Sequence, residues 1–552
     1  QLPRALQSDC RRPALGQGPT DVSHSPPPST EGQTGIARAA SIIALGGIAS
    51  RVLGLVRETI IADLFGASGL VSAFRVASSV PAMIYDLLVG GMLSAALVPV
   101  FSEVAEREGR EALWALFSRV ASLAAVVLAA LVLLLELVAP QLAWLLGGGF
   151  DPALQTSLAQ MIRIIAPAVL FFGLSGVVTG LLYSLKQFTF PAFGAAVFNL
   201  GIIIAAPLLA GRLDAFSLAV GVLLGSLLQL LVQTPALRGT RIRFNLDLAD
   251  PALRRILRLY LPIALGIIIS NVQIAIDRRL ASATGESSIA WMANATTMVQ
   301  LPHGLVAVAI SLAVLPTLSR MSATGDKEGY RHTLAQGLRL VLVLIIPATL
   351  GLFVLAEPII ALLFEHGRFT AHDTFWTTQA LRLYLAGLIF ATVDWPLNYA
   401  SYARQDTLTP ALVGVVSVGV YLVVALALLQ PMGMLGLVLA DSAKHVSHAL
   451  IMMVVTWRST GGMADLGLVR TTGKALLASG IMAGLMALVS RGLMSISADS
   501  STNVLLREFV LVGLTAAVGI VAYLGLATLL RIEEVSEVGD LVRRRLRGPK
   551  LD

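Results

Sequence analysis

Apolar segments of membrane-spanning length recur along most of this chain, and they constrain its fold more than any other feature. A helix that crosses the hydrocarbon core of a bilayer needs about 20 mostly apolar residues. Of the 552 residues, 56% are hydrophobic and only 13% are charged, whereas soluble domains carry about 25% charged residues. The sequence therefore predicts an all-α polytopic membrane protein, because helices satisfy their own backbone polar groups within a bilayer.

We predict about 14 transmembrane helices from this recurrence. Their approximate boundaries are residues 39–64, 70–101, 112–139, 157–185, 189–211, 215–236, 252–282, 287–318, 334–364, 374–402, 408–430, 433–457, 472–494 and 505–531. Basic residues concentrate in every second loop, as the positive-inside rule describes for cytoplasmic loops. This alternation predicts a multi-pass protein of the plasma membrane with both termini in the cytoplasm.

The two ends of the chain differ from its apolar middle. Residues 1–37 are rich in Pro, Ser, Gly and Gln, and we predict that they form a disordered cytoplasmic tail. Residues 532–552 contain a run of arginines that begins at Arg543, and we predict a basic cytoplasmic tail that contacts anionic lipid. The chain has one cysteine, Cys10, which excludes a disulfide framework.

Two pairs of similar stretches indicate an internal repeat. Residues 94–102 and 311–319 share the spacing S-x-A-x-x-P-x-x-S, and residues 186–192 resemble residues 404–411 at nearly the same offset. We therefore predict two six-helix lobes related by a pseudo-two-fold axis along the membrane normal, with substrate sites between them. The predicted parts are an N-lobe, a C-lobe and two further C-terminal helices, in residues 38–240, 241–460 and 461–531.

The first span contains charges at a depth that isolated lipid-facing helices avoid. Arg51, Arg57 and Glu58 lie in it, and small residues such as Ser50 and Gly54 share a helical stripe with Arg57. Small residues allow a neighbouring helix to approach closely, so one interpretation is a packing seam with two buried ion pairs. The interpretation that we favour is a cationic site for an anionic substrate inside a transporter.

Two further arginines extend this candidate site. Arg75 in span two either snorkels toward the interface or joins the cationic cluster. Arg278 in span seven is another candidate for gripping a phosphate group. The candidate substrate-binding residues are therefore Arg51, Arg57, Ser50, Glu58, Arg75 and Arg278.

Spans seven and twelve carry titratable residues that are candidates for ion coupling. Asp277 in span seven either pairs with an arginine or serves as a cation ligand. In span twelve, the i, i+3, i+4, i+7 spacing of Asp441, Lys444, His445 and His448 puts all four on one helical face. That face is either a self-neutralising packing cluster or a proton-responsive element, because histidine titrates near neutral pH.

The chain contains no recognisable catalytic or metal-binding motif. It has no G-x-x-x-x-G-K-[ST] stretch for ATP, no H-E-x-x-H and no Cys/His spacing typical of metal sites. The net charge of +7 comes without a basic patch interleaved with aromatic residues, so we expect no nucleic-acid partner. We predict a transporter rather than an enzyme, with no cofactor and no metal ion.

Several stretches are characteristic in combination. Residues 50–58 read S-R-V-L-G-L-V-R-E, and other notable stretches are Phe65-Gly66-Ala67, Pro99, Asp277-Arg278, Gln300-Leu301-Pro302 and residues 315–319, 364–370 and 402–410. Together they resemble the lipid II flippase family known as MurJ or MviN, of the multidrug/oligosaccharidyl-lipid/polysaccharide exporter superfamily. The first stretch is similar to the S-R-x-L-G-x-x-R-[DE] signature of that family.

This resemblance implies both a fold and a function. The fold would be two six-helix lobes plus two C-terminal helices around a central cationic cavity. The function would be translocation of lipid II, an undecaprenyl-diphosphate-linked muropeptide, from the inner to the outer leaflet of a bacterial plasma membrane for cell wall biogenesis. Alternating access would be driven by the membrane potential or by a gradient of Na⁺ or H⁺. The cavity arginines of the family correspond to Arg51 and Arg57, whose guanidinium forks suit a diphosphate.

The chain also departs from the family pattern. Tyr85 and Thr297 stand where the family has arginines, while Ser72 and Gly90 stand where it has acidic residues. These departures predict a less cationic cavity than is usual in the family. Either Arg75, Arg278 or Arg279 compensates for the missing arginines, or the substrate differs.

The coupling ion and the substrate have alternatives. Some family members bind sodium through an acid on span seven and polar residues on span eleven. Asp277 matches the acid, but span eleven offers mainly Ser417 and Tyr421, which argues against sodium. The alternative functions are another lipid-linked oligosaccharide or polysaccharide exporter, a drug/cation antiporter, or a non-transporting membrane scaffold. An antiporter cavity is expected to be acidic, which Arg51 and Arg57 oppose.

Overall fold

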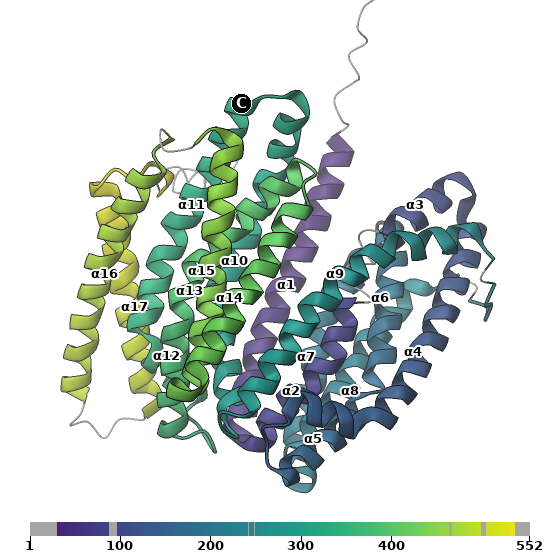
Figure 1. Cartoon of the computed structure of the whole chain (residues 1–552), viewed down its shortest axis with the longest axis horizontal. Helices are drawn as coiled ribbons and strands as arrows, with labels where there is room; N and C mark the ends of the chain where they lie inside the picture. Colours follow the sequence, from purple (N-terminus) through teal and green to yellow (C-terminus); the bar gives the residue numbers. More distant parts are fainter. Residues whose placement is uncertain are drawn as a thin grey trace, which may run out of the picture.

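The computed structural model describes residues 30–87, 96–240, 242–247, 249–462, 466–497 and 504–535. Within these residues the regular structure is entirely helical, which confirms the predicted all-α fold (Figure 1). Most of the two predicted tails, including the arginine run from Arg543, lies outside the described residues. The first helix begins at Thr30, shortly after Pro28, whereas the prediction placed residues 30–37 in the tail.

Each predicted span corresponds to one helix or to two consecutive helices. The helices are α1 (Thr30–Phe65), α2 (Gly69–Tyr85), α3 (Val98–Arg107), α4 (Gly109–Gly147), α5 (Pro152–Ile165), α6 (Ala168–Ser184), α7 (Thr189–Leu213), α8 (Phe216–Leu231), η3 (Thr234–Leu237), α9 (Pro251–Ser282), α10 (Ser288–Thr324), α11 (Lys327–Val354), α12 (Ala356–Phe364), α13 (Ala371–Ala403), α14 (Leu408–Met432), α15 (Met434–Thr460), α16 (Leu468–Ser497) and α17 (Val504–Leu529). Among the described residues, 11 helical segments are long and apolar enough to cross a membrane. The chain is thus a multi-pass membrane protein.

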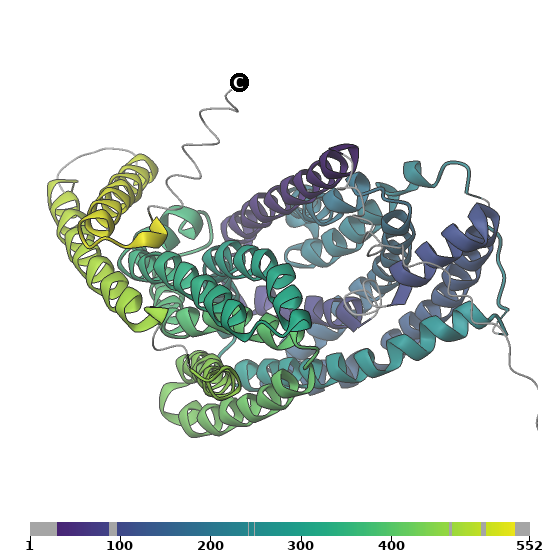
Figure 2. The same cartoon turned by 90° about the horizontal axis from the view of Figure 1, so that it is seen from above.

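The helices form two bundles that lie side by side (Figures 1 and 2). We call α1–α8 the N-lobe, in which α7 packs against both α1 and α8. We call α10–α15 the C-lobe, in which α13 packs against α10 and α15. α16 and α17 pack against each other at the far side of the C-lobe, where α16 also contacts α11. This arrangement agrees with two lobes plus two C-terminal helices.

α9 joins the two lobes instead of belonging to one of them. Leu253 and Ile256 near its start are buried in a cluster of N-lobe residues, and the helix packs against α4. Near its other end, Asp277 accepts a hydrogen bond from Tyr421 of α14 in the C-lobe. Figure 1 shows α9 crossing the molecule diagonally. α9 therefore contacts both lobes.

Small residues line the contact between α1 and α7. A Cβ atom added to Gly46 would lie 2.2 Å from the carbonyl oxygen of Ala192, and Gly54 faces the side chain of Asn199. The Asn199 amide donates a hydrogen bond to the carbonyl oxygen of Ser50 over 3.1 Å. The stripe of small residues in the first span is therefore a helix-packing seam, which fixes the rotation of α1 about its axis.

The Gly201→Ala substitution should lower the melting temperature of the protein. A Cβ atom at Gly201 would lie 2.3 Å from the Cα atom of Gly225 on α8, and overpacking of this kind costs about 1–3 kcal/mol. Gly211→Ala is the matched control, because Gly211 lies in the same helix with nothing within 4 Å. Thermal unfolding in detergent compares the two variants, and equal melting temperatures would contradict the close contact of α7 with α8.

The lobes meet at one end of the molecule, which we call the closed end and which comprises residues 63–72, 282–290 and 365–370. Arg368 donates its backbone N–H to the carbonyl oxygen of Asp63 over 2.8 Å. Gly367 has φ of +54°, and a Cβ atom there would lie 2.1 Å from the same oxygen, so only glycine fits. Deeper inside, the hydroxyl of Ser72 accepts the Ala290 N–H over 3.2 Å.

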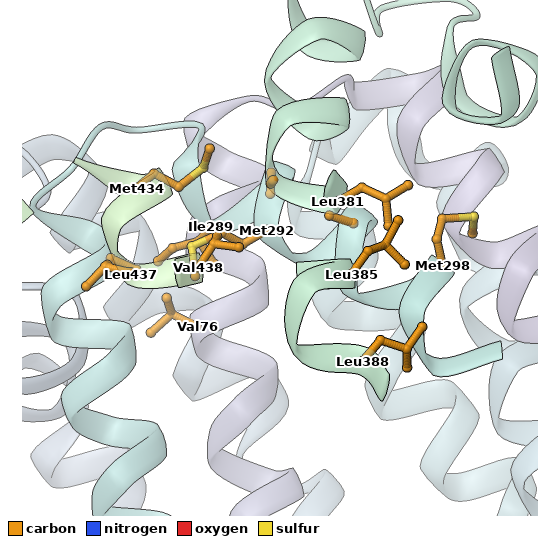
Figure 3. Packing of buried hydrophobic residues seen from close by; sticks show 14 of the residues in the cluster. Val76, Ile289, Met292, Met298, Leu381, Leu385, Leu388, Met434, Leu437 and Val438 are labelled. Atoms are coloured by element: carbon orange, nitrogen blue, oxygen red, sulfur yellow. The ribbon is translucent and has the colours of Figure 1, made fainter. Parts of the chain in front are cut away.

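An apolar layer lies next to these contacts. Figure 3 shows Val76 of α2 near Ile289 and Met292 of α10 and near Leu437 and Val438 of α15. Each of these five side chains is at most 3% exposed. If the lobes parted here, water would reach these side chains. Exposure of each would cost about 1.5–3 kcal/mol. Apolar packing therefore adds to the polar contacts that hold the lobes together at this end.

Candidate functional site

A cavity of about 590 Å³ lies between the two lobes. We call it the central cavity; α1 and α2 form one wall, and α9, α10, α13 and α15 form the other. Four basic and four acidic side chains of the described part of the chain line it: Arg57, Arg75, Arg278, Lys444, Glu58, Asp86, Asp277 and Asp441. Because these charges balance formally, the way in which they pair determines what the cavity can bind.

Glu58 is the centre of the N-lobe wall. Its side chain is only 2% exposed, and it forms ion pairs with both Arg57 and Arg75. Arg75 Nη1 donates to Glu58 Oε1 over 3.0 Å, and Arg57 Nε donates to the same oxygen over 3.1 Å. A buried carboxylate requires such partners, because leaving it unpaired costs about 3–5 kcal/mol. One carboxylate between two guanidinium groups leaves one positive charge in this cluster.

Arg57 lies on α1 and Arg75 lies on α2, and contacts within the N-lobe fix the positions of both side chains. Arg57 Nη1 also donates to Asn199 Oδ1 of α7 over 3.0 Å, which connects the cluster to the packing seam. The Arg75 side chain is 13% exposed, so it joins the cationic cluster and does not snorkel away from it. Asn199 is not among the residues predicted from the sequence. A single amide in the otherwise apolar fifth span was the signal that could have identified it.

The polar residues of α15 divide between two partners. Lys444 Nζ lies 2.5 Å from Asp441 Oδ1, and His445 Nε2 lies 3.7 Å from Asp441 Oδ2. His448 Nδ1 instead lies 2.6 Å from Asp394 Oδ1 on α13. Asp394 is absent from the predicted site, although an acid in the middle of an apolar span is a sign of function.

Asp277 on α9 is occupied by partners within the protein. The Tyr421 hydroxyl donates to Asp277 Oδ1 over 2.7 Å, and Arg278 Nη1 lies 4.0 Å from Asp277 Oδ2. Within the described residues, no three or more His, Cys, Asp or Glu side chains gather where they could hold a metal ion. The charges of Asp277 and Asp441, on the wall opposite α1 and α2, are thus largely neutralised by Arg278 and Lys444.

Ser50, Arg51 and Arg279 are not among the residues that line the central cavity. Arg51 is exposed, and its Nη1 donates to the carbonyl oxygen of Gln300 on α10 over 3.4 Å. Ser50 contributes its carbonyl group to the packing seam. Arg279 lies over the ring of Trp144, 5.8 Å from the centroid. Arg51 and Arg57 point in directions about 120° apart, because they are six positions apart on one helix.

The departures from the family pattern fall in different places. Tyr85 packs against Phe172, with ring centroids 5.4 Å apart, and does not line the central cavity. Thr297 does line it. Ser72 lies at the closed end, and Gly90 is outside the described residues.

The N-lobe wall has the chemistry of an anion site. A guanidinium group presents several N–H donors in a planar fork that matches the oxygens of phosphate. Arg75 Nε is buried and has no hydrogen-bond partner among the described residues. With one positive charge in excess, the cluster of Arg57, Glu58 and Arg75 offers both charge and donors to an anionic ligand.

Sequence comparison connects the chain with one family. A family model described as lipid II flippase MurJ matches residues 61–506. The lipid II flippase MurJ of Burkholderia cenocepacia is 32% identical over 388 residues, which cover 68% of this chain and 75% of that protein. The probable lipid II flippase MurJ of Bdellovibrio bacteriovorus is 29% identical over 532 residues, covering 94% of this chain and 99% of that protein.

Solved structures show the same likeness. A lipid II flippase MurJ in an inward closed conformation superposes with a TM-score of 0.74 at 25% identity, covering 88% of this chain and 98% of that chain. An inward-facing multidrug resistance transporter of the MATE family has a TM-score of 0.64 at 13% identity, covering 75% of this chain and 96% of that chain. The match to the MATE-family transporter supports the fold alone. The family-model match begins after Arg57, so the role of the arginine cluster has to be argued from its geometry.

Proposed function

The chain belongs to the MurJ family of lipid II flippases, and we propose that it carries lipid II from the inner to the outer leaflet by alternating access. Family membership supports a transporter of a lipid-linked substrate in a bacterial inner membrane. The proposal concerns how this chain holds and moves the substrate.

The observation that carries the proposal is the pair of arginines on Glu58. Lipid II carries an anionic diphosphate, and Arg57 and Arg75 both line the central cavity. Hydrogen bonds to charged groups contribute about 1.5–3 kcal/mol each. Glu58 keeps both guanidinium groups oriented before the substrate arrives, which lowers the entropy lost on binding. The Arg278 and Lys444 side chains face the same cavity and are further contacts for the polar headgroup.

We place the closed end on the outer side of the membrane. Basic residues concentrate in the loops at the opposite end, and this pattern is typical of cytoplasmic loops. In this orientation lipid II enters the central cavity from the inner leaflet. Parting of the lobes at the closed end then releases it to the outer leaflet.

We propose that the membrane potential or a proton gradient drives this cycle. The candidates for coupling are Asp277, Asp441, His445 and His448. Asp394 is a further candidate, because its Oδ1 lies 2.6 Å from His448 Nδ1. The hydroxyl of Tyr421 already occupies Asp277, which favours protons over sodium as the coupling ion.

A double variant with His445→Ala and His448→Ala should lose the pH dependence of flipping, because it removes both imidazole rings from the polar face of α15. These two rings face Asp441, Lys444 and Asp394, so a change of their charge alters the contact of α15 with α13. Flipping rates in proteoliposomes at several pH values measure this effect. His332→Ala is the control, because His332 is exposed on α11. An unchanged pH profile in the double variant would eliminate the proton-responsive element.

Rescue of flippase-depleted bacterial cells tests the function itself. The wild-type chain should restore growth and should move fluorescent lipid II across reconstituted bilayers. A chain that inserts into the membrane at a normal level without rescue would instead favour another exporter of the superfamily or a non-transporting scaffold.

A further inference from the structure

We propose that a second cavity, inside the N-lobe, holds a sugar ring of the lipid-linked headgroup. This inference rests on the proposed function, because it assigns one part of the same substrate to a separate compartment. The second cavity, which we call the side cavity, has a volume of about 330 Å³ and lies among α1, α2, α6, α7 and α8. Sites for small molecules have volumes of about 300–1,000 Å³.

The side cavity and the central cavity share one wall. Arg57, Arg75, Ser78 and Ala82 line both of them. A diphosphate held by the two arginines therefore lies at the junction of the cavities. Its two covalent neighbours are a prenyl chain and a sugar, so the group that enters the side cavity is one of these two.

The helices that line the side cavity pack closely against one another. A Cβ atom at Gly46 would lie 2.2 Å from the backbone of α7, and one at Gly201 would lie 2.3 Å from Gly225 on α8. Between α6 and α8, Gln233 Nε2 donates to Ser175 Oγ over 2.6 Å. A long prenyl chain has to continue into the bilayer, and at these positions the helix pairs leave no room for it to pass between them. A sugar ring is compact and needs no such route.

Four aromatic side chains line the side cavity: Phe74, Tyr85, Phe172 and Phe198. The ring centroids of Tyr85 and Phe172 are 5.4 Å apart at 62°, and those of Phe172 and Phe198 are 5.2 Å apart at 53°. The face of an aromatic ring carries partial negative charge and attracts positively polarised hydrogen atoms. The C–H groups on one side of a pyranose ring are of this kind, so a sugar suits these walls.

Unpaired polar atoms stand at the entrance to the side cavity. The hydroxyl of Ser78 and the Nε of Arg75 are buried and have no hydrogen-bond partner among the described residues. Buried polar atoms without partners are rare in proteins, and each one calls for an explanation. Gln229 adds an amide to the lining and is 8% exposed. Sugar hydroxyl groups next to the diphosphate would pair with these atoms, whereas a prenyl chain would leave them unpaired.

The Phe172→Leu and Phe198→Leu substitutions should each weaken the binding of lipid II about three- to tenfold, which corresponds to the loss of one aromatic contact. They should leave the binding of undecaprenyl diphosphate unchanged, because that lipid has the same prenyl chain and diphosphate but no sugar. Leucine keeps the apolar character of each site and removes the ring. Dissociation constants of both lipids are measured with the purified full-length chain in nanodiscs, and melting temperatures report on folding.

Phe188→Leu is the matched control, because Phe188 packs against Tyr183 at a centroid distance of 5.4 Å and lines neither cavity. It should bind both lipids like the wild type. If the Phe172→Leu and Phe198→Leu variants bind lipid II normally, or lose both lipids equally, the side cavity does not hold a sugar, and the flippase function stands. If the wild-type chain binds neither lipid, the proposed function fails and this inference fails with it.

Discussion

The triple variant Arg57→Gln, Glu58→Gln and Arg75→Gln should reach the membrane at the wild-type level but fail to rescue flippase-depleted cells. The change removes two positive charges together with the buried carboxylate, so no charge is left buried without a partner. Glutamine cannot present a guanidinium fork to phosphate, and each charged donor contributes about 1.5–3 kcal/mol. We therefore expect the affinity for undecaprenyl diphosphate to fall about 100-fold or more.

Complementation, membrane level and ligand binding are measured together for this variant. Arg279→Gln is the control, because it also removes an arginine from the membrane region, but one that lies over Trp144. That variant should rescue growth. Rescue by the triple variant at a normal membrane level would show that this cluster does not grip the diphosphate.

The membrane spans and the packing seam could be predicted because both depend on local features of the sequence. An apolar segment has to be buried in lipid or protein wherever it lies in the fold, so each predicted span has a matching helix. Helical periodicity likewise puts Gly46, Ser50 and Gly54 on one side of α1, and that side packs against α7. The local sequence is sufficient for statements of this kind.

The partners of the charged residues could not be predicted, because they depend on which helices become neighbours. Periodicity separates Arg51 from Arg57 around α1, yet nothing local shows that one would meet Gln300 and the other Asn199. The contact between Asp394 and His448 joins two helices whose pairing follows only from the packing of the whole C-lobe.

The side cavity is hidden from the sequence for the same reason. Its aromatic residues come from α2, α6 and α7, and each of them alone resembles an ordinary core residue. Only when these helices assemble do the rings enclose a space that adjoins Arg57 and Arg75. A site built from distant residues of common types carries no local signature.

A covalent link across the closed end should stop flipping. The variant is Asp63→Cys with Arg368→Cys in a Cys10→Ser background, because Cys10 is the one natural cysteine. Both positions are exposed, and a backbone hydrogen bond of 2.8 Å joins them. This hydrogen bond brings the two backbones into direct contact, as a disulfide between the positions requires.

Oxidation should lower the flipping rate of this variant about tenfold or more, because alternating access requires the lobes to part where the link holds them. Flipping of fluorescent lipid II in proteoliposomes measures the rate before oxidation, after oxidation and after reduction. Each single-cysteine variant should keep its rate under all three conditions, and reduction should restore the double variant. If the linked protein flips lipid II at the wild-type rate, the lobes do not separate at Asp63 and Arg368, and release takes place elsewhere.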